Sequence, residues 1–118
     1  MANTTTVTRT GDFITLVFDG TGADYLLSTD TTGNPGGATE MKIASIMYRP
    51  DADGDILIIR EGASTGAIIF ADEATDSGNE SGPRVQYYNG GLGKRMNPCI
   101  TASQCTSLGA GHVTFELV

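Results

Sequence analysis

Residues 55–70 read DILIIREGASTGAIIF and contain two strongly apolar runs separated by a glycine-rich segment. The first run, Asp55 to Arg60, holds four consecutive aliphatic residues, and the second extends from Ala67 to Ala71. β-Branched residues fit a pleated strand, and glycine allows the chain to reverse. The stretch therefore predicts a hairpin. The unbroken aliphatic run also predicts that both faces of the first strand are covered.

Another strand is expected directly before this hairpin, at residues 41–49. The apolar spacing of MKIASIMYR would also fit about one and a half turns of helix. However, a short polar loop and an apolar strand follow it, and that context favours a strand. The three strands would then form a meander, with a hairpin turn at residues 50–54.

Four further segments have the character of short strands, at residues 12–18, 85–88, 99–101 and 112–118. The last one alternates cleanly, with Val113, Phe115 and Leu117 on one face. Loops rich in glycine, proline and polar residues separate these segments. The pattern predicts an all-β fold, an antiparallel β-sandwich or barrel that is jelly-roll-like.

The length of 118 residues predicts one compact β domain, at residues 11–118, preceded by an arm. Residues 1–10 are rich in threonine and have few apolar anchors, so we expect an extended N-terminal arm that becomes ordered when it adds to a sheet edge. The arm is the expected interface, and its residues are Thr4, Thr5, Thr6, Val7 and Thr8.

The charge balance excludes some partners. Fourteen acidic and seven basic residues give a net charge of −7, and the basic residues are scattered along the chain. Nucleic acids and anionic membrane surfaces require clustered cations, so neither is an expected partner. No signal peptide and no apolar stretch of about 20 residues is present, so we expect synthesis in a cytoplasm and no membrane span.

The segment Asp51-Ala52-Asp53-Gly54-Asp55 resembles the start of a calcium loop. An EF-hand loop needs glycine at position 6 and glutamate at position 12. Counting from Asp51, those positions hold Ile56 and Gly62, and a glycine stands at position 4. We therefore expect a turn without metal, built on the Asp53-Gly54 pair.

No catalytic site is expected either. His112 is the sole histidine, and neither Cys99 nor Cys105 belongs to a recognisable nucleophile motif. Gly90 to Arg95 lacks the spacing and the Ser or Thr of a phosphate loop. The prediction is a protein that is not an enzyme, without catalytic residues, cofactor or metal. A disulfide between the two cysteines is geometrically possible but opposed by a reducing cytoplasm.

The chain resembles a known class of structural proteins. Its length, its acidic, Gly- and Thr-rich all-β character, its threonine-rich arm and the stretch DGDILIIREGASTGAIIF are similar to small virion proteins of tailed bacteriophages, above all capsid decoration, or cement, proteins. The resemblance implies a homo-oligomer, with a trimer favoured, made in the host cytoplasm. It would bind the major capsid protein on the virion surface and stabilise the shell.

Two alternatives stay open at the level of the sequence. The same features fit a phage tail or fibre component. From a different class, a small ligand-binding β-barrel is compatible with the chain, with Tyr25, Tyr48, Tyr87 and Tyr88 as lining residues.

Overall fold

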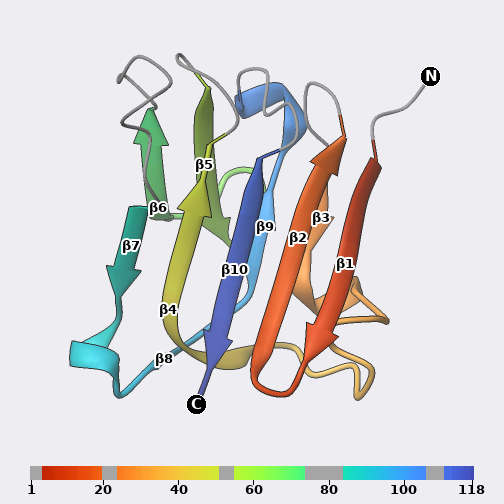
Figure 1. Ribbon diagram of the computed structural model, residues 1–118, viewed down its shortest axis with the longest axis vertical. Coiled ribbons are helices and arrows are strands. Elements are labelled where there is room, and N and C mark those ends of the chain that lie inside the picture. The colour runs from red at the N-terminus through yellow and green to blue at the C-terminus, as the bar shows by residue number, and fades with distance from the viewer. Residues whose placement is uncertain (1–3, 20–23, 51–54, 74–83, 106–110) are drawn as a thin grey trace.

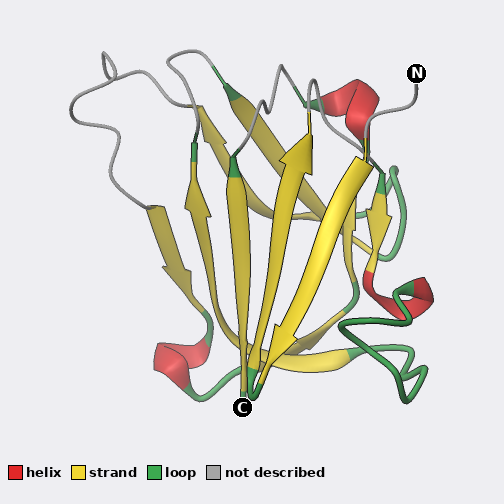
Figure 2. Cartoon of the chain, turned by 45° about the vertical axis from the view of Figure 1, so that its right-hand side comes forward, coloured by secondary structure: helices red, strands yellow, loops and turns green. Residues whose placement is uncertain are grey.

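The computed structural model describes residues 4–19, 24–50, 55–73, 84–105 and 111–118. In this part of the chain, two antiparallel sheets pack face to face (Figures 1 and 2). The expected all-β sandwich is confirmed. The strands are Thr4–Thr10 (β1), Phe13–Asp19 (β2), Tyr25–Leu26 (β3), Met41–Arg49 (β4), Ile56–Glu61 (β5), Ile68–Glu73 (β6), Arg84–Tyr87 (β7), Lys94–Met96 (β8), Pro98–Ile100 (β9) and His112–Leu117 (β10). Within the described ranges the chain also forms short 3-10 helices at Leu27–Thr29 (η1), Asn89–Gly91 (η3) and Ala102–Gln104 (η4).

The strand order is that of a jelly roll. The six-stranded sheet has the order β1-β2-β10-β4-β7, with β8 also paired to β4, and the four-stranded sheet has the order β3-β9-β5-β6. The pairs are nested, because β5–β6 is enclosed in turn by β4–β7, β3–β9 and β2–β10. This nesting of antiparallel strands across two sheets defines the jelly-roll architecture. The hairpin predicted from residues 55–70 lies at its centre.

The core lies between the inner faces of the two sheets. Strands β2 and β10 show the alternation that the sequence predicts, because every second side chain is buried and the intervening ones are half-buried or exposed. The buried residues of these two strands are Ile14, Leu16, Phe18, Val113, Phe115 and Leu117. The largest side chains buried completely are Tyr48, Phe18 and Phe115, so aromatic rings fill much of the space between the sheets.

Strand β5 is covered on one face rather than two. Leu57 and Ile59 are completely buried in the core, whereas Ile56 and Ile58 are only half-buried on the opposite face. The expectation of a doubly covered strand is therefore wrong. Strand β5 lies inside its sheet, between β9 and β6, but each sheet of a sandwich packs against the other through one face only.

The expected meander is also wrong at its first turn. Strand β4 pairs with β10 and β7 in the six-stranded sheet, whereas β5 pairs with β6 and β9 in the other sheet. The connection at residues 50–55 therefore carries the chain from one sheet to the other. Residues 51–54 lie outside the described residues, so the turn expected at Asp53-Gly54 is not among the described features.

The second turn of the meander is a hairpin, as predicted. Glu61 N–H donates to the Ala67 carbonyl (2.8 Å), and the chain reverses through residues 62–66. Gly66 is required there, because a Cβ at that position would collide with the backbone carbonyl of Glu61. Gly62 has a φ of 75°, a conformation that glycine adopts without strain.

The N-terminal arm is part of the sandwich. Thr4 to Thr10 pair antiparallel with Asp19 to Phe13 of β2 over seven residues. Val7 packs against the core, and Arg9 Nη1 donates to the Gly33 carbonyl (2.7 Å). The arm does add to a sheet edge, as its composition predicts. That edge belongs to its own chain, so the expected boundary at residue 10 does not separate an arm from the domain.

Candidate interaction surface

The four tyrosines do not line a common site. Tyr25 and Tyr88 are core residues whose hydroxyls donate to Asp30 Oδ2 (2.7 Å) and to the Ile69 carbonyl (2.6 Å). Tyr48 is completely buried, and no described residue bonds its hydroxyl. Tyr87 lies on the outside of β7 and is 62% exposed. The ring of residues expected for a ligand-binding barrel is therefore not assembled.

The three buried tyrosines lead to a prediction at alkaline pH. Burial is the main cause that raises the pKa of Tyr25, of Tyr48 and of Tyr88, the last to about 12. A tyrosine in the unfolded chain has a pKa of about 10, so the folded state binds these protons more tightly. Stability should therefore be retained up to about pH 10 and fall as the pH rises further towards 12.

Urea unfolding between pH 8 and pH 12 measures this dependence. Tyr48→Phe should make the fall above pH 10 shallower, because one of the three titrating groups is gone. A free energy of unfolding that stays constant up to pH 12 would contradict the prediction.

The histidine and the cysteines are not brought together. His112 is exposed on β10 of the six-stranded sheet, whereas Cys99 belongs to β9 of the four-stranded sheet. Cys105 packs against the core, its Sγ lies 3.8 Å from the Ile58 carbonyl oxygen, and burial raises the pKa of its thiol. Both cysteines are free thiols.

Of the three aspartates in the calcium-like segment, only Asp55 belongs to the described residues, and it is buried. Asp51 and Asp53 lie outside them. Within the described ranges, no group of three or more His, Cys, Asp or Glu side chains is arranged to hold a metal ion.

The outer face of the six-stranded sheet is broad and carries few charges. No described element covers this face (Figures 1 and 2). The register of the strands aligns its residues in three rows, which are Thr8–Thr15–Thr114–Met47–Val85, Thr10–Phe13–Glu116–Ser45–Tyr87 and Thr6–Val17–His112–Arg49. Thr6 and Thr8, two of the expected interface residues, are exposed in these rows. Arg49 and Glu116 have opposite charges, and Ser45 Oγ donates to Glu116 Oε1 (2.9 Å).

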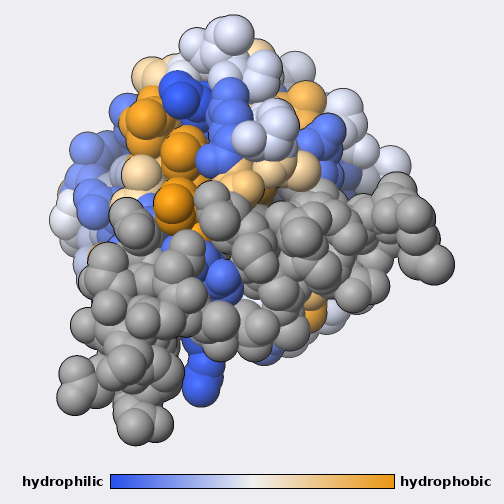
Figure 3. All heavy atoms as spheres, turned by 90° about the horizontal axis from the view of Figure 1, so that it is seen from above, coloured by the Kyte–Doolittle hydropathy of each residue, from blue (hydrophilic) through white to orange (hydrophobic). Residues whose placement is uncertain are grey.

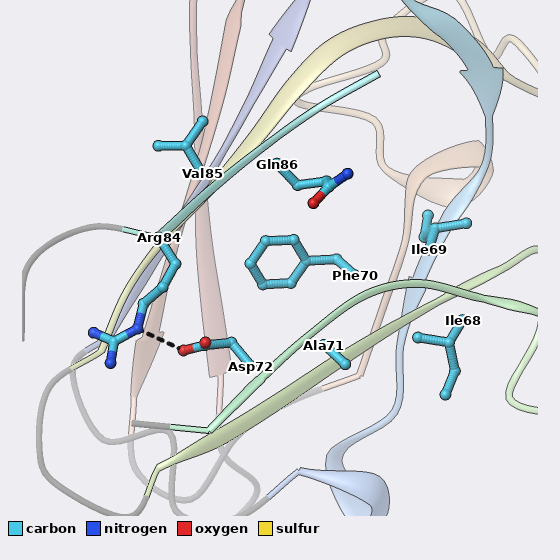
Figure 4. Close-up of a pocket in the computed structure, with 8 residues that line it drawn as sticks. All are labelled: Ile68, Ile69, Phe70, Ala71, Asp72, Arg84, Val85 and Gln86. Atoms are coloured by element: carbon cyan, nitrogen blue, oxygen red, sulfur yellow. Dashed lines mark ion pairs between the residues drawn. The ribbon is translucent and has the colours of Figure 1, made fainter. Parts of the chain in front are cut away.

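A groove opens at one side of the sandwich, between the edge strands of the two sheets. It has a volume of about 460 Å³ and is lined by residues 68–72 of β6 and 84–86 of β7. Phe70 lies in its middle and Gln86 points into it, whereas Val85 points away (Figure 4). Arg84 Nε and Asp72 Oδ2 form an ion pair (2.8 Å) that joins the two edges at one end.

The same side of the molecule exposes large apolar side chains. Val85 and Tyr87 are exposed on β7, Ile68 is exposed at the start of β6, and Leu92 follows η3 with 75% of its surface exposed. A different face, the end of the sandwich seen from above, shows another small group of hydrophobic residues bordered by hydrophilic ones (Figure 3). Grouped exposed apolar residues of this kind are typical of interaction surfaces.

The sequence predicts the arm as the interface and does not single out the exposed apolar pair Val85 and Tyr87 of β7. A signal was present, because Val85 and Tyr87 alternate with the polar residues Arg84 and Gln86. Alternation alone places the apolar pair on the core side of a strand. In the structure, Arg84 and Gln86 face the inside of the sandwich, because they pair with the buried residues Tyr48 and Ile46.

Comparison of the chain with family models, with curated proteins and with solved structures gave no match. Within the described residues, no helix has the length and apolar character needed to cross a membrane.

Proposed function

We propose that the chain is a non-enzymatic structural protein of a virion, of the capsid decoration type. It binds the shell of the major capsid protein on the capsid surface and acts there as a homo-oligomer. The observation that carries this proposal is the outer face of the six-stranded sheet, which no described element covers. Five paired strands across this face, spaced about 4.8 Å apart, make a surface roughly 20 Å wide.

The composition of this face suits contact with another protein. Its three rows contain threonines, Phe13, Val17, Met47 and Tyr87, with one arginine and one glutamate. The exposed pair Lys42–Arg95 of β4 and β8 adds two positive charges beyond these rows. The whole chain has a net charge of −7, so most of its excess negative charge lies elsewhere. A partly apolar surface whose three rows carry few charges loses little hydration free energy when those rows are covered.

The fold adds support of a more general kind. Jelly rolls are common among viral capsid domains, although one fold serves many functions. The ligand-binding alternative finds less support, because core side chains fill the space between the sheets. A tail or fibre component would use the same kind of surface, and the experiment below distinguishes it.

Co-sedimentation with purified capsid shells that lack the chain tests the proposal. The wild-type protein should sediment with tail-free shells, and Phe13→Arg should weaken this binding about tenfold or more, because it replaces an apolar contact with a charged side chain that must lose its hydration when the face is covered. Ser64→Arg, on the turn of the opposite sheet, is the matched control and should bind normally. Binding to isolated tails but not to shells would favour the tail component, and binding to neither would contradict a virion role.

A further inference from the structure

Four basic residues of the six-stranded sheet lack partners among the described residues. Three of the seven basic residues of the sequence do have partners, and these are Arg9, Arg60 and Arg84. The other four are exposed on β4 and β8, and they are Lys42, Arg49, Lys94 and Arg95. No hydrogen bond or ion pair joins their charged groups to another described residue. Basic residues that are scattered along the sequence therefore come together on one sheet.

Two of these cations lie directly opposite each other. Lys42 of β4 pairs with Arg95 of β8, next to the pair of Ile43 and Lys94. Ile43 is buried in the core, so the alternation of the strands places Lys42 and Arg95 on the outer face. Gly93 provides space for the aliphatic part of Lys42, because a Cβ there would lie 3.0 Å from the Lys42 Cγ. Like charges in a cross-strand pair repel each other, and an anionic group that contacts both removes that repulsion.

A third cation lies at the other end of the same face. Arg49 of β4 pairs with the exposed His112 of β10. Seven residue steps separate Arg49 from Lys42, which corresponds to about 20 Å along the strand. Met47 and Phe13 lie in the rows between them. The outer face therefore has an apolar centre between two positively charged ends.

The sign of these charges is opposite to that of the whole chain. The side chains described on the outer face include three positive ones and one negative one, Glu116, and Glu116 accepts a hydrogen bond from Ser45. The chain as a whole has a net charge of −7. Protein interfaces commonly combine an apolar centre with a polar rim, and the sign of the rim charges selects the partner.

We propose that the outer face binds an acidic protein surface, whose carboxylates contact Lys42 and Arg95 at one end of the face and Arg49 at the other. The inference rests on the proposed function and deepens it, because it states the chemistry of the shell surface that the chain binds. Nucleic acid fits less well. A phosphate backbone is matched by a continuous array of cations, whereas about 20 Å of mostly uncharged surface separates the two ends of this face.

Shell binding at low and high salt, about 50 mM and about 500 mM sodium chloride, tests the contact. The wild type should bind about threefold or more weakly at high salt, because salt screens the attraction between exposed charges. At low salt, the double variant Lys42→Gln/Arg95→Gln should bind about threefold or more weakly than the wild type, and its affinity should depend less on salt. A double variant that binds as tightly as the wild type would overturn the inference.

Ala63→Glu/Ser64→Glu is the matched control, because it makes the net charge more negative by the same two units. Both residues are exposed on the turn between β5 and β6 of the other sheet. The affinity of this variant for shells should stay within about twofold of the wild type. A control that weakens binding as much as Lys42→Gln/Arg95→Gln would show that only the net charge matters, and would refute the contact. Thermal unfolding verifies that both variants are folded.

An octaglutamate peptide gives a readout that does not depend on shells. In low salt it should shift the amide NMR signals of β4 and β8 more than those of the turn at residues 62–66. The shifts should be about threefold smaller in Lys42→Gln/Arg95→Gln. A single-stranded oligonucleotide with eight phosphates is the comparison at equal charge. Tighter binding of the oligonucleotide at the same residues would favour nucleic acid and contradict an acidic protein partner.

These measurements separate the inference from the proposed function. A chain that binds shells equally well with and without the two cations retains the proposed function and loses the inference. A chain that binds no shell loses the virion role, and the octaglutamate titration then decides whether the outer face binds acidic protein.

Discussion

Replacing Ile59 by alanine is expected to lower the free energy of unfolding by about 2 to 5 kcal/mol, the range for aliphatic residues truncated in a packed core. Ile59 is completely buried and pairs with both Phe70 of β6 and Ile100 of β9. Its loss would leave a cavity at the centre of the nested hairpins, where the neighbouring strands cannot move without breaking their own pairing. Urea unfolding followed by circular dichroism measures the change.

Ile58→Ala is the matched control, because it removes the same atoms from the adjacent position of the same strand. Ile58 is half-buried on the outside of the sheet, so we expect a loss of about 1 kcal/mol. Equal losses at the two positions would mean that β5 is covered on both faces, contrary to the structure.

Deletion of residues 1–10 is expected to lower the free energy of unfolding by about 2 to 4 kcal/mol, which is the balance between lost strand pairing and regained chain entropy. The deletion removes the whole of β1, the half-buried Val7 and the bond from Arg9 to the Gly33 carbonyl. It also exposes the backbone of β2 as a new edge. Thermal unfolding of the truncated and intact proteins measures the effect.

Thr8→Ala is the control for this deletion, because it changes an exposed side chain and keeps the strand. Its effect should stay within about 0.5 kcal/mol. A truncated protein that melts at the same temperature as the intact one would show that residues 1–10 act as an independent arm. In that case the arm would again be a candidate for contacts with neighbouring subunits.

Local pattern predicts some pairings and not others, and residues 50–66 show why. The turn at Gly62–Gly66 joins two strands of one sheet, whereas the connection at residues 50–55 joins strands of different sheets. Both are short, polar and rich in turn-forming residues, so the sequence does not distinguish them. Strand β4 pairs with β7, which lies about 40 residues further along the sequence, and no local signal identifies that partner.

For a related reason, the sequence alone does not predict that Val85 and Tyr87 are exposed. Val85 and Tyr87 have the spacing of core residues, but the jelly roll places Arg84 and Gln86 towards the groove and leaves the apolar pair outside. The tyrosines show the opposite difference, because the sequence allows them to line an accessible site and the structure buries most of them. Three of the four that would suit a ligand site are buried in the core.

The sequence by itself determined the class of fold, the alternation of β2 and β10, and the hairpin of β5 and β6. Each of these depends on side chains that are neighbours along the chain and on backbone freedom at single glycines. Tertiary structure alone decided which strands pair across the two sheets, that residues 4–10 close the edge beside β2, and which apolar residues remain exposed. Those features depend on contacts between distant segments, which form only when the whole core packs at once.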